Sequence, residues 1–262
     1  EISHFEKYPD IVQVFDNLAS EYERYRQTYP AKLFDDLREL SGVSSDAKVL
    51  EVGSGTGKAT EALAQMGFSI LCIEPGPDLI RIAKQKLQDF SNVSFRNMVF
   101  EEWEPEDRYD LCTSATAFHF LDPQTKYQKV AGCLKERGVF APFWMNHVPS
   151  FSPVFEDIRQ VYRKFAPGLE DSQRNFYKSI RNSELEILDT GLFSQVEVRT
   201  YQWEQDFNAD NFVGLLNTNS SHRKLDPETR EGLFEGIRQV IEQHGGRITK
   251  IESAMLFVAT RK

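Results

Sequence analysis

Residues 49–60 read VLEVGSGTGKAT, and they constrain the fold of this chain more than any other stretch. A short apolar run, typical of a buried strand, leads into glycines at every second position and then into a helical pattern. Glycine tolerates the left-handed backbone of a tight turn and lets a ligand approach the main chain closely. The stretch therefore predicts a strand, a ligand-binding turn and a helix in direct succession.

Short apolar runs alternate with helical patterns over the first part of the chain. Runs that are apolar on both faces are typical of parallel strands covered by helices on both sides. The pattern predicts an α/β fold with a doubly wound, mostly parallel, seven-stranded sheet and helical cap insertions. The expected strands are residues 47–53, 68–74, 93–98, 109–115, 138–145, 193–207 and 253–262, and the expected cap helices lie within residues 148–180 and 208–244.

Composition narrows the class of partner. The chain has 262 residues, 40% of them hydrophobic, and a net charge of −9, which disfavours a nucleic-acid partner because such binding rests on clustered Lys and Arg. No apolar stretch is long enough to span a bilayer. The cysteines Cys72, Cys112 and Cys133 form no C-x-x-C pair, so we expect neither a metal site nor disulfides, and a cytoplasmic location.

The glycine spacing separates three kinds of ligand. A dinucleotide fingerprint, G-x-G-x-x-G, requires glycine where Lys58 stands. A phosphate-binding P-loop requires one more residue between Gly53 and Lys58, and a hydroxyl residue in place of Ala59. The stretch therefore lacks the residues with which either of these two motifs binds phosphate. A nicotinamide oxidoreductase therefore remains only a less favoured alternative.

The same stretch resembles the first motif of class I S-adenosylmethionine-dependent methyltransferases, in which an acidic strand residue precedes G-x-G-x-G. The resemblance implies that the turn, Gly53, Ser54, Gly55 and Gly57, receives the amino-acid tail of S-adenosylmethionine. It also implies that Glu51 organises the loop amides or faces the ammonium group of the cofactor.

Later motifs extend the resemblance. Glu74, followed by Pro75, ends the second strand, where a carboxylate accepts both ribose hydroxyls. The segment NMVFEEW implies that Phe100 flanks the adenine ring and that Glu101 lies near its exocyclic amine, although Val99 stands where the family often has aspartate. These residues complete an expected adenosine site.

Three further residues of the expected site lie outside that adenosine site. Ser114, after the fourth strand, is expected within reach of the methionine part of the cofactor. Residues 15–30 resemble a helix that folds over the cofactor in related enzymes; Tyr22 and Arg26 are four residues apart, so they share one helix face, and Arg26 could meet the cofactor carboxylate.

His119 is the candidate general base, because it lies in the first turn beyond the fourth strand on the ligand side of the sheet. Asn146, His147 and His222 are lesser candidates. An N-P-P-[YF] motif is absent, which favours a small-molecule acceptor over an amino group of DNA or protein.

The resemblance implies a methyltransferase that uses S-adenosylmethionine and acts by in-line methyl transfer. We expect a single domain, in which residues 1–147 form the S-adenosylmethionine-binding core with its lid helix and residues 148–262 add the cap helices and the last two strands. A cofactor-binding protein without catalysis remains an alternative. The acceptor and the oligomeric state stay open.

Overall fold

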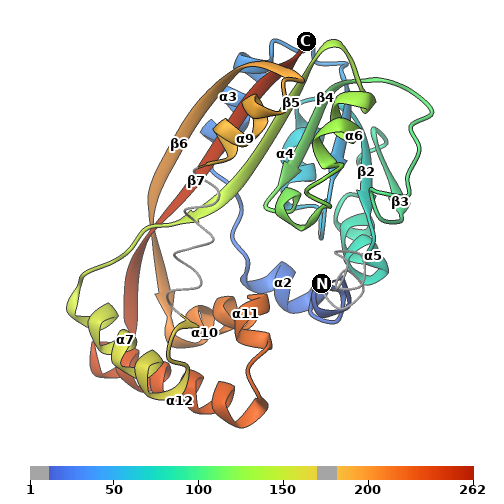
Figure 1. Cartoon of the computed structure of the whole chain (residues 1–262). Coiled ribbons are helices and arrows are strands. Elements are labelled where there is room, and N and C mark those ends of the chain that lie inside the picture. The colour runs from blue at the N-terminus through green and yellow to red at the C-terminus, as the bar shows by residue number, and fades with distance from the viewer. Residues whose placement is uncertain (1–11, 170–181) are drawn as a thin grey trace.

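The computed structural model describes residues 12–169 and 182–262, and Figure 1 shows their arrangement. A seven-stranded sheet has the order β3-β2-β1-β4-β5-β7-β6. β7 runs antiparallel to both of its neighbours, and the other paired strands are parallel, as the sequence predicted. The strands are β1 (Lys48–Val52), β2 (Ser69–Glu74), β3 (Val93–Asn97), β4 (Tyr109–Ala115), β5 (Leu134–His147), β6 (Phe193–Asn208) and β7 (Arg247–Arg261).

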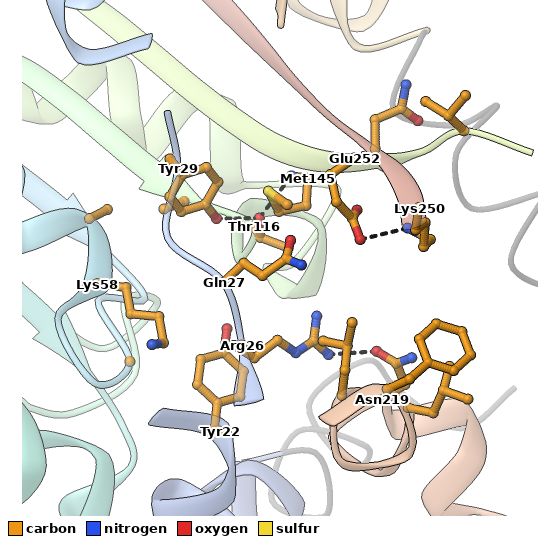
Figure 2. Close-up of a pocket in the computed structure, with 18 of the residues that line it drawn as sticks. Tyr22, Arg26, Gln27, Tyr29, Lys58, Thr116, Met145, Asn219, Lys250 and Glu252 are labelled. Atoms are coloured by element: carbon orange, nitrogen blue, oxygen red, sulfur yellow. Dashed lines mark hydrogen bonds and ion pairs between the residues drawn. The ribbon is translucent and has the colours of Figure 1, made fainter. Parts of the chain in front are cut away.

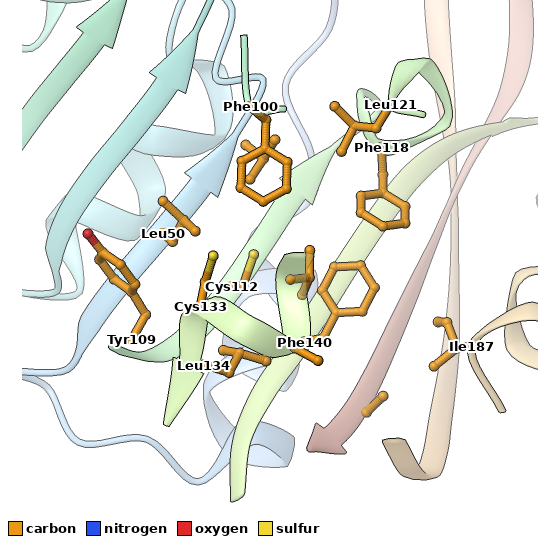
Figure 3. Close-up of a cluster of buried hydrophobic side chains, with 14 of the residues drawn as sticks. Leu50, Phe100, Tyr109, Cys112, Phe118, Leu121, Cys133, Leu134, Phe140 and Ile187 are labelled. Carbon is orange, nitrogen blue, oxygen red and sulfur yellow. The ribbon is translucent and has the colours of Figure 1, made fainter. Parts of the chain in front are cut away.

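Helices cover both faces of the sheet. Successive side chains of a strand point to opposite faces, so Val49 and Leu50 of β1 belong to two different apolar clusters. Figure 3 shows the cluster around Leu50, where Cys112 of β4 and Cys133 of a helix pack as small apolar groups. The covering helices are α3 (Ala31–Ser41), α4 (Lys58–Gln65), α5 (Pro77–Lys86), α6 (Lys126–Cys133) and α9 (Ser183–Asp189).

A separate helical cap is attached to the C-terminal end of β6 and the N-terminal end of β7 (Figure 1). Its own apolar cluster joins Ile158, Leu216 and Ile237 to Phe207 and Ile248, which are the last buried residues of β6 and the first of β7. Helix α2 (Ala19–Tyr25), the expected lid, lies beside this cap. The cap helices are α7 (Pro153–Phe165), α10 (Ala209–Asn217), α11 (Ser220–Arg223) and α12 (Pro227–Gln243).

Two strands are longer than expected. β5 begins at Leu134 rather than at residue 138, and β7 begins at Arg247 rather than at residue 253. β7 pairs with β6 along its whole length, down to the partners Asn208 and Arg247. Pairing with a strand distant in sequence therefore extends β7 beyond its apolar run.

The described residues contain neither a membrane-spanning helix nor a metal-binding cluster. In residues 12–169 and 182–262, no helix is both long enough and apolar enough to cross a bilayer. The same ranges contain no group of His, Cys, Asp and Glu side chains arranged to hold a metal ion.

Candidate functional site

The glycine turn follows β1 directly and begins helix α4. Gly53, Gly55 and Gly57 all have positive φ angles, of 73°, 55° and 77°, which glycine adopts without strain. A Cβ on Gly53 would stand 2.4 Å from the Cβ of Ala117, so this position has room only for glycine. A Cβ on Gly55 would meet nothing within 4 Å, because this residue faces open space. Gly57 lines neither of the cavities described below, and a Cβ on it would stand 3.0 Å from Leu87, so the turn presents bare backbone to a cavity at Gly53 and Gly55.

Glu74 ends β2 beside the turn. Its carboxylate oxygens accept hydrogen bonds from the amides of Gly55 and Gly76, each at 2.9 Å. Burial raises the pKa of Glu74 to about 7, and these two amide bonds oppose the shift. Each oxygen keeps a second lone pair, so the carboxylate ties down the turn and still has acceptor capacity for ligand hydroxyls.

Glu51 lies behind the turn rather than in front of it. Its side chain is fully buried, and Oε2 accepts a hydrogen bond from the Thr60 hydroxyl of α4 at 2.6 Å. Burial raises the pKa of Glu51 to about 7. Glu51 lines neither of the cavities described next, so it ties β1 to α4, and the ligand-facing alternative loses support.

Two cavities meet at the glycine turn. The turn cavity extends past the ends of β1 and β2 toward Glu74, Pro75 and Phe100. The cap cavity extends from the turn toward helices α7 and α10 and strand β7, and Figure 2 shows its lining. The residues that line both cavities are Tyr22, Arg26, Gly53, Gly55, Ala115, Thr116, Met145 and Asn219.

Thr116 lies at the junction of the two cavities, and no sequence motif predicted a role for it. It follows β4 with a φ of 54°, which is rare for a β-branched residue and marks local strain. Its hydroxyl is held by the Tyr29 hydroxyl at 2.6 Å and by the amide of Met145 at 3.2 Å. The strained backbone is therefore fixed on both sides.

The remaining expected cofactor residues divide into two groups. Pro75 and Phe100 line the turn cavity, and Ser54 lines the cap cavity. Glu101 and Ser114 line neither. Ser114 lies inside β4, fully buried, and donates to the carbonyl of Val52 at 2.8 Å, so the expectation that it follows the strand is wrong. Glu101 accepts a hydrogen bond from the amide of Asp122 at 3.0 Å.

Tyr22 and Arg26 line both cavities. Arg26 lies just past the end of α2 with extended backbone, and its guanidinium stacks 5.3 Å from the centre of the Tyr22 ring. The guanidinium also donates to the Thr218 hydroxyl at 2.8 Å and to Oδ1 of Asn219 at 2.6 Å. Arg26 therefore links the lid helix to the cap.

His119 lies in a single 3₁₀ turn, Phe118–Phe120, and lines the turn cavity. The indole of Trp144 donates to a ring nitrogen of His119 at 3.2 Å, and an indole can only donate. Burial, together with Lys126 and Arg26, lowers the pKa of His119 to about 3. The neutral ring therefore carries its proton on the other nitrogen, which is a donor. These observations disfavour His119 as a general base.

The lesser candidates also separate. Asn146 lines the cap cavity, whereas His222 is buried inside the cap and bonds the Tyr162 hydroxyl at 2.8 Å. Sequence reasoning missed Gln27, Lys250 and Glu252, which line the cap cavity. Lys250 and Glu252 are charged residues on the buried face of β7. These charges within a strand were the one feature of the sequence that pointed to a site there.

A strand order with β7 antiparallel, a glycine turn after β1 and an acidic residue ending β2 define an α/β protein that binds a nucleoside cofactor. Comparison with known proteins is consistent with this class. Residues 49–138 match a family model described as "Methyltransferase domain".

Two relatives and one solved structure illustrate the similarity. A "Probable S-adenosylmethionine-dependent methyltransferase CRG1" of Saccharomyces cerevisiae is 26% identical over 70% of this chain, which spans 66% of the yeast protein, slightly under two thirds. A malonyl-[acyl-carrier protein] O-methyltransferase of Paenibacillus sp. is 28% identical over 79% of this chain and 78% of its own length. A Haemonchus contortus phosphoethanolamine N-methyltransferase, solved with S-adenosylhomocysteine, superposes with a TM-score of 0.57 at 16% identity, covering 100% of this chain and 60% of that one.

Residues 49–138 are thus similar to methyltransferase domains, and the relatives include a probable S-adenosylmethionine-dependent methyltransferase, so S-adenosylmethionine is the cofactor that these similarities indicate. The site fits that cofactor. Gly55 leaves open space before the turn, and Glu74 presents a carboxylate at the place where a ribose is bound in such folds.

Proposed function

We propose that this chain transfers the methyl group of S-adenosylmethionine to a small-molecule acceptor held in the cap cavity. The observation that carries the proposal is the wall shared by the two cavities at Gly53, Gly55 and Thr116. A cofactor seated on the turn and an acceptor seated under the cap would meet at this wall. In-line displacement requires such a meeting of the methyl carbon and the nucleophile.

The cofactor supplies a methyl group on a sulfonium, which is an already activated carbon. The chain's own residues then have to bind, align and exclude water. We assign ribose binding to Glu74, the walls around the adenine to Pro75 and Phe100, and closure to Tyr22 and Arg26. His119, neutral and donating, would orient rather than deprotonate.

The small-molecule class of acceptor rests on two observations. The cap cavity is lined from the sheet, the lid region and the cap, an arrangement that favours an enclosed ligand over a macromolecule. The net charge of −9 opposes nucleic acid. The relatives carry names that imply different acceptor atoms, oxygen and nitrogen, so they leave the acceptor of this chain open.

The proposal also covers the domain organisation and the cellular location of the protein. We assign residues 1–147 to the cofactor-binding core and residues 148–262 to the cap plus the last two strands of the same sheet. Cys72, Cys112 and Cys133 are free and buried, which supports a reducing compartment such as the cytoplasm.

Ligand binding and turnover test the proposed function. S-adenosylhomocysteine should raise the melting temperature because it binds only the native state, whereas NAD should not. Glu74→Ala should weaken that binding by roughly 1.5–3 kcal/mol, the range for hydrogen bonds to a charged group. The exposed Glu102→Ala is the control.

Release of S-adenosylhomocysteine with a panel of small acceptors then separates catalysis from binding alone. Binding with no turnover on any acceptor would favour the non-catalytic alternative. A protein stabilised by NAD and not by S-adenosylhomocysteine would overturn the proposal.

A further inference from the structure

The first half of β7 carries charged residues on its buried face. Exposure alternates from Arg247 to Glu252, so Ile248, Lys250 and Glu252 point to the same side. Ile248 belongs to the apolar core of the cap, and Ala254 belongs to a core of the sheet. Lys250 and Glu252 lie between these cores and line the cap cavity.

Lys250 and Glu252 form a buried ion pair. Their side chains are 11% and 6% exposed, and the ammonium nitrogen lies 2.8 Å from Oε1 of Glu252 (Figure 2). Burying both charges costs desolvation energy that a single ion pair does not reliably recover, so stability is a weak reason for such a pair. A role in binding explains its position on the cavity wall better.

The pair leaves hydrogen-bond donors for a ligand. An ammonium has three donors, and among the described residues Glu252 is the one polar partner found for Lys250. Nε2 of Gln27 lines the same cavity, is buried, and has no partner within the described chain. Oδ1 of Asn146 is likewise buried without a partner within the described chain, so it can accept a hydrogen bond from a ligand. The cavity wall thus carries hydrogen-bond donors that an oxygen ligand can use, together with acceptors, such as Oδ1 of Asn146, that are unpartnered among the residues described.

The charge of the lining has the opposite sign to that of the whole chain. Four cations line the cap cavity, Arg26, Lys58, Arg159 and Lys250, against the single carboxylate of Glu252. Carboxylates outside the lining offset two of these cations, because Glu23 pairs with Lys58 and Glu156 pairs with Arg159.

Arg26 is not offset in this way. Within the described residues, its guanidinium donates hydrogen bonds to Thr218 and Asn219, which are neutral. Because Glu252 pairs with Lys250, Arg26 is the one cation of the described lining without a carboxylate partner. The lining therefore keeps an excess of one positive charge in a chain of net charge −9 and favours an anionic ligand.

We propose that the acceptor is a small carboxylic acid, and this proposal rests on the proposed function. Its carboxylate binds Lys250 and Gln27, while Glu252 holds Lys250 in place. Its apolar body lies against Ile158 and Leu216, which line the cap side of the same cavity. Lys250 is thereby a specificity-determining residue for the acceptor.

Three probes with one aromatic body test the charge preference. They are 3-(4-hydroxyphenyl)propionate, its primary amide and tyramine, and octanoate, octanamide and octylamine repeat the series on an aliphatic body. Binding to protein saturated with S-adenosylhomocysteine is measured by saturation-transfer NMR and calorimetry. At least one acid should bind about tenfold or more tightly than its amide and its amine, as expected for a charge-assisted hydrogen bond.

Variants then locate the preference. Lys250→Met should abolish the preference for acids while leaving the affinity for S-adenosylhomocysteine unchanged, and the exposed Lys224→Met should change neither. Lys250→Met/Glu252→Gln removes both charges, so it keeps the test valid if the single variant, with its unpaired carboxylate, fails to fold.

The outcomes separate the two proposals. Equal binding of acid and amide, preference for the amine, or no binding of either acid overturns the carboxylate assignment while the cofactor site stands. A persisting acid preference in the folded Lys250 variants overturns the role of Lys250. Failure of S-adenosylhomocysteine to bind the wild-type chain removes the proposed function itself.

Discussion

Two buried glutamates flank the glycine turn and serve it in different ways. Glu74 fixes the turn from the cavity side through two amides, whereas Glu51 supports it from behind through Thr60. Burial raises the pKa of both carboxyls to about 7 from an ordinary value of 4.5. Their protonation therefore links folding to pH.

The stability of the ligand-free protein should fall as the pH rises from about 4.5 to about 7. In this window the unfolded chain has already lost the proton of Glu51, while the folded chain still holds it, so folding is penalised progressively. A full shift of this size corresponds to about 3 kcal/mol for Glu51. Urea unfolding across this range provides the measurement.

Glu51→Gln should reduce that pH dependence and leave the share due to Glu74, because the amide oxygen still accepts the Thr60 hydroxyl but no longer titrates. Glu102→Gln, on the exposed surface, should leave the slope unchanged. A slope that is the same in wild type and Glu51→Gln would show that Glu51 does not titrate in this window.

At the scale of elements, the contact between α2 and α10 positions the lid. A Cβ on Gly214 of α10 would stand 2.5 Å from ring atoms of Tyr25. The absence of a side chain therefore lets α2 dock closely against the cap. Tyr22 and Arg26, at the same end of the lid, line both cavities.

Gly214→Ala should weaken binding of S-adenosylhomocysteine and reduce the free energy of unfolding by about 1–3 kcal/mol, the usual cost of overpacking. Gly132→Ala in α6 is the matched control, because its Cβ would meet nothing within 4 Å. The control should be neutral or stabilising by up to about 1 kcal/mol, since alanine favours helix. Calorimetry and urea unfolding measure both. Equal behaviour of the two variants would mean that the close contact with Tyr25 is unimportant.

At the scale of the whole molecule, the sheet and the cap have separate apolar cores. The long strands β6 and β7 connect them (Figure 1). Arg26 adds a polar link from α2 to Thr218 and Asn219. A ligand at the junction of the cavities would touch the sheet, the lid and the cap together.

Binding of S-adenosylhomocysteine should therefore slow amide hydrogen exchange in α2 and around residues 215–223, and change little in the central strands β1 and β4. Local opening that the ligand suppresses exchanges faster in the free protein. Mass spectrometry of peptides from the free and bound protein measures this. Arg26→Met should reduce the protection around residues 215–223. Protection confined to the glycine turn would contradict coupling of the cap to the cofactor site.

The sequence by itself determined the central sheet and the cofactor. Runs such as residues 47–53 and 109–115 are apolar on both faces, so only a buried parallel strand suits them, and the structure has β1 and β4 there. The glycines at 53, 55 and 57 all adopt positive φ, a local requirement that a local pattern can reveal. The position of Glu74 beside the turn was equally predictable, because this residue ends the next strand of the parallel sheet.

Only the tertiary structure decided which side chains face the ligand. Ser114 and Glu51 lie on strands at the site, yet each points into a buried hydrogen bond with a neighbouring element. The sequence predicted His119 as a general base. In the structure, Trp144 of β5 donates to one ring nitrogen of His119, so the other nitrogen carries the proton.

The acceptor side of the site depended most on tertiary contacts. The stretch RITKIE, residues 247–252, buries Lys250 and Glu252 and leaves Ile251 41% exposed, the reverse of what hydrophobic patterning assumes. Pairing with β6 makes this stretch a strand, and the cap turns its charged face inward. A polar cavity wall is defined by elements far apart in sequence, so no local pattern encodes it.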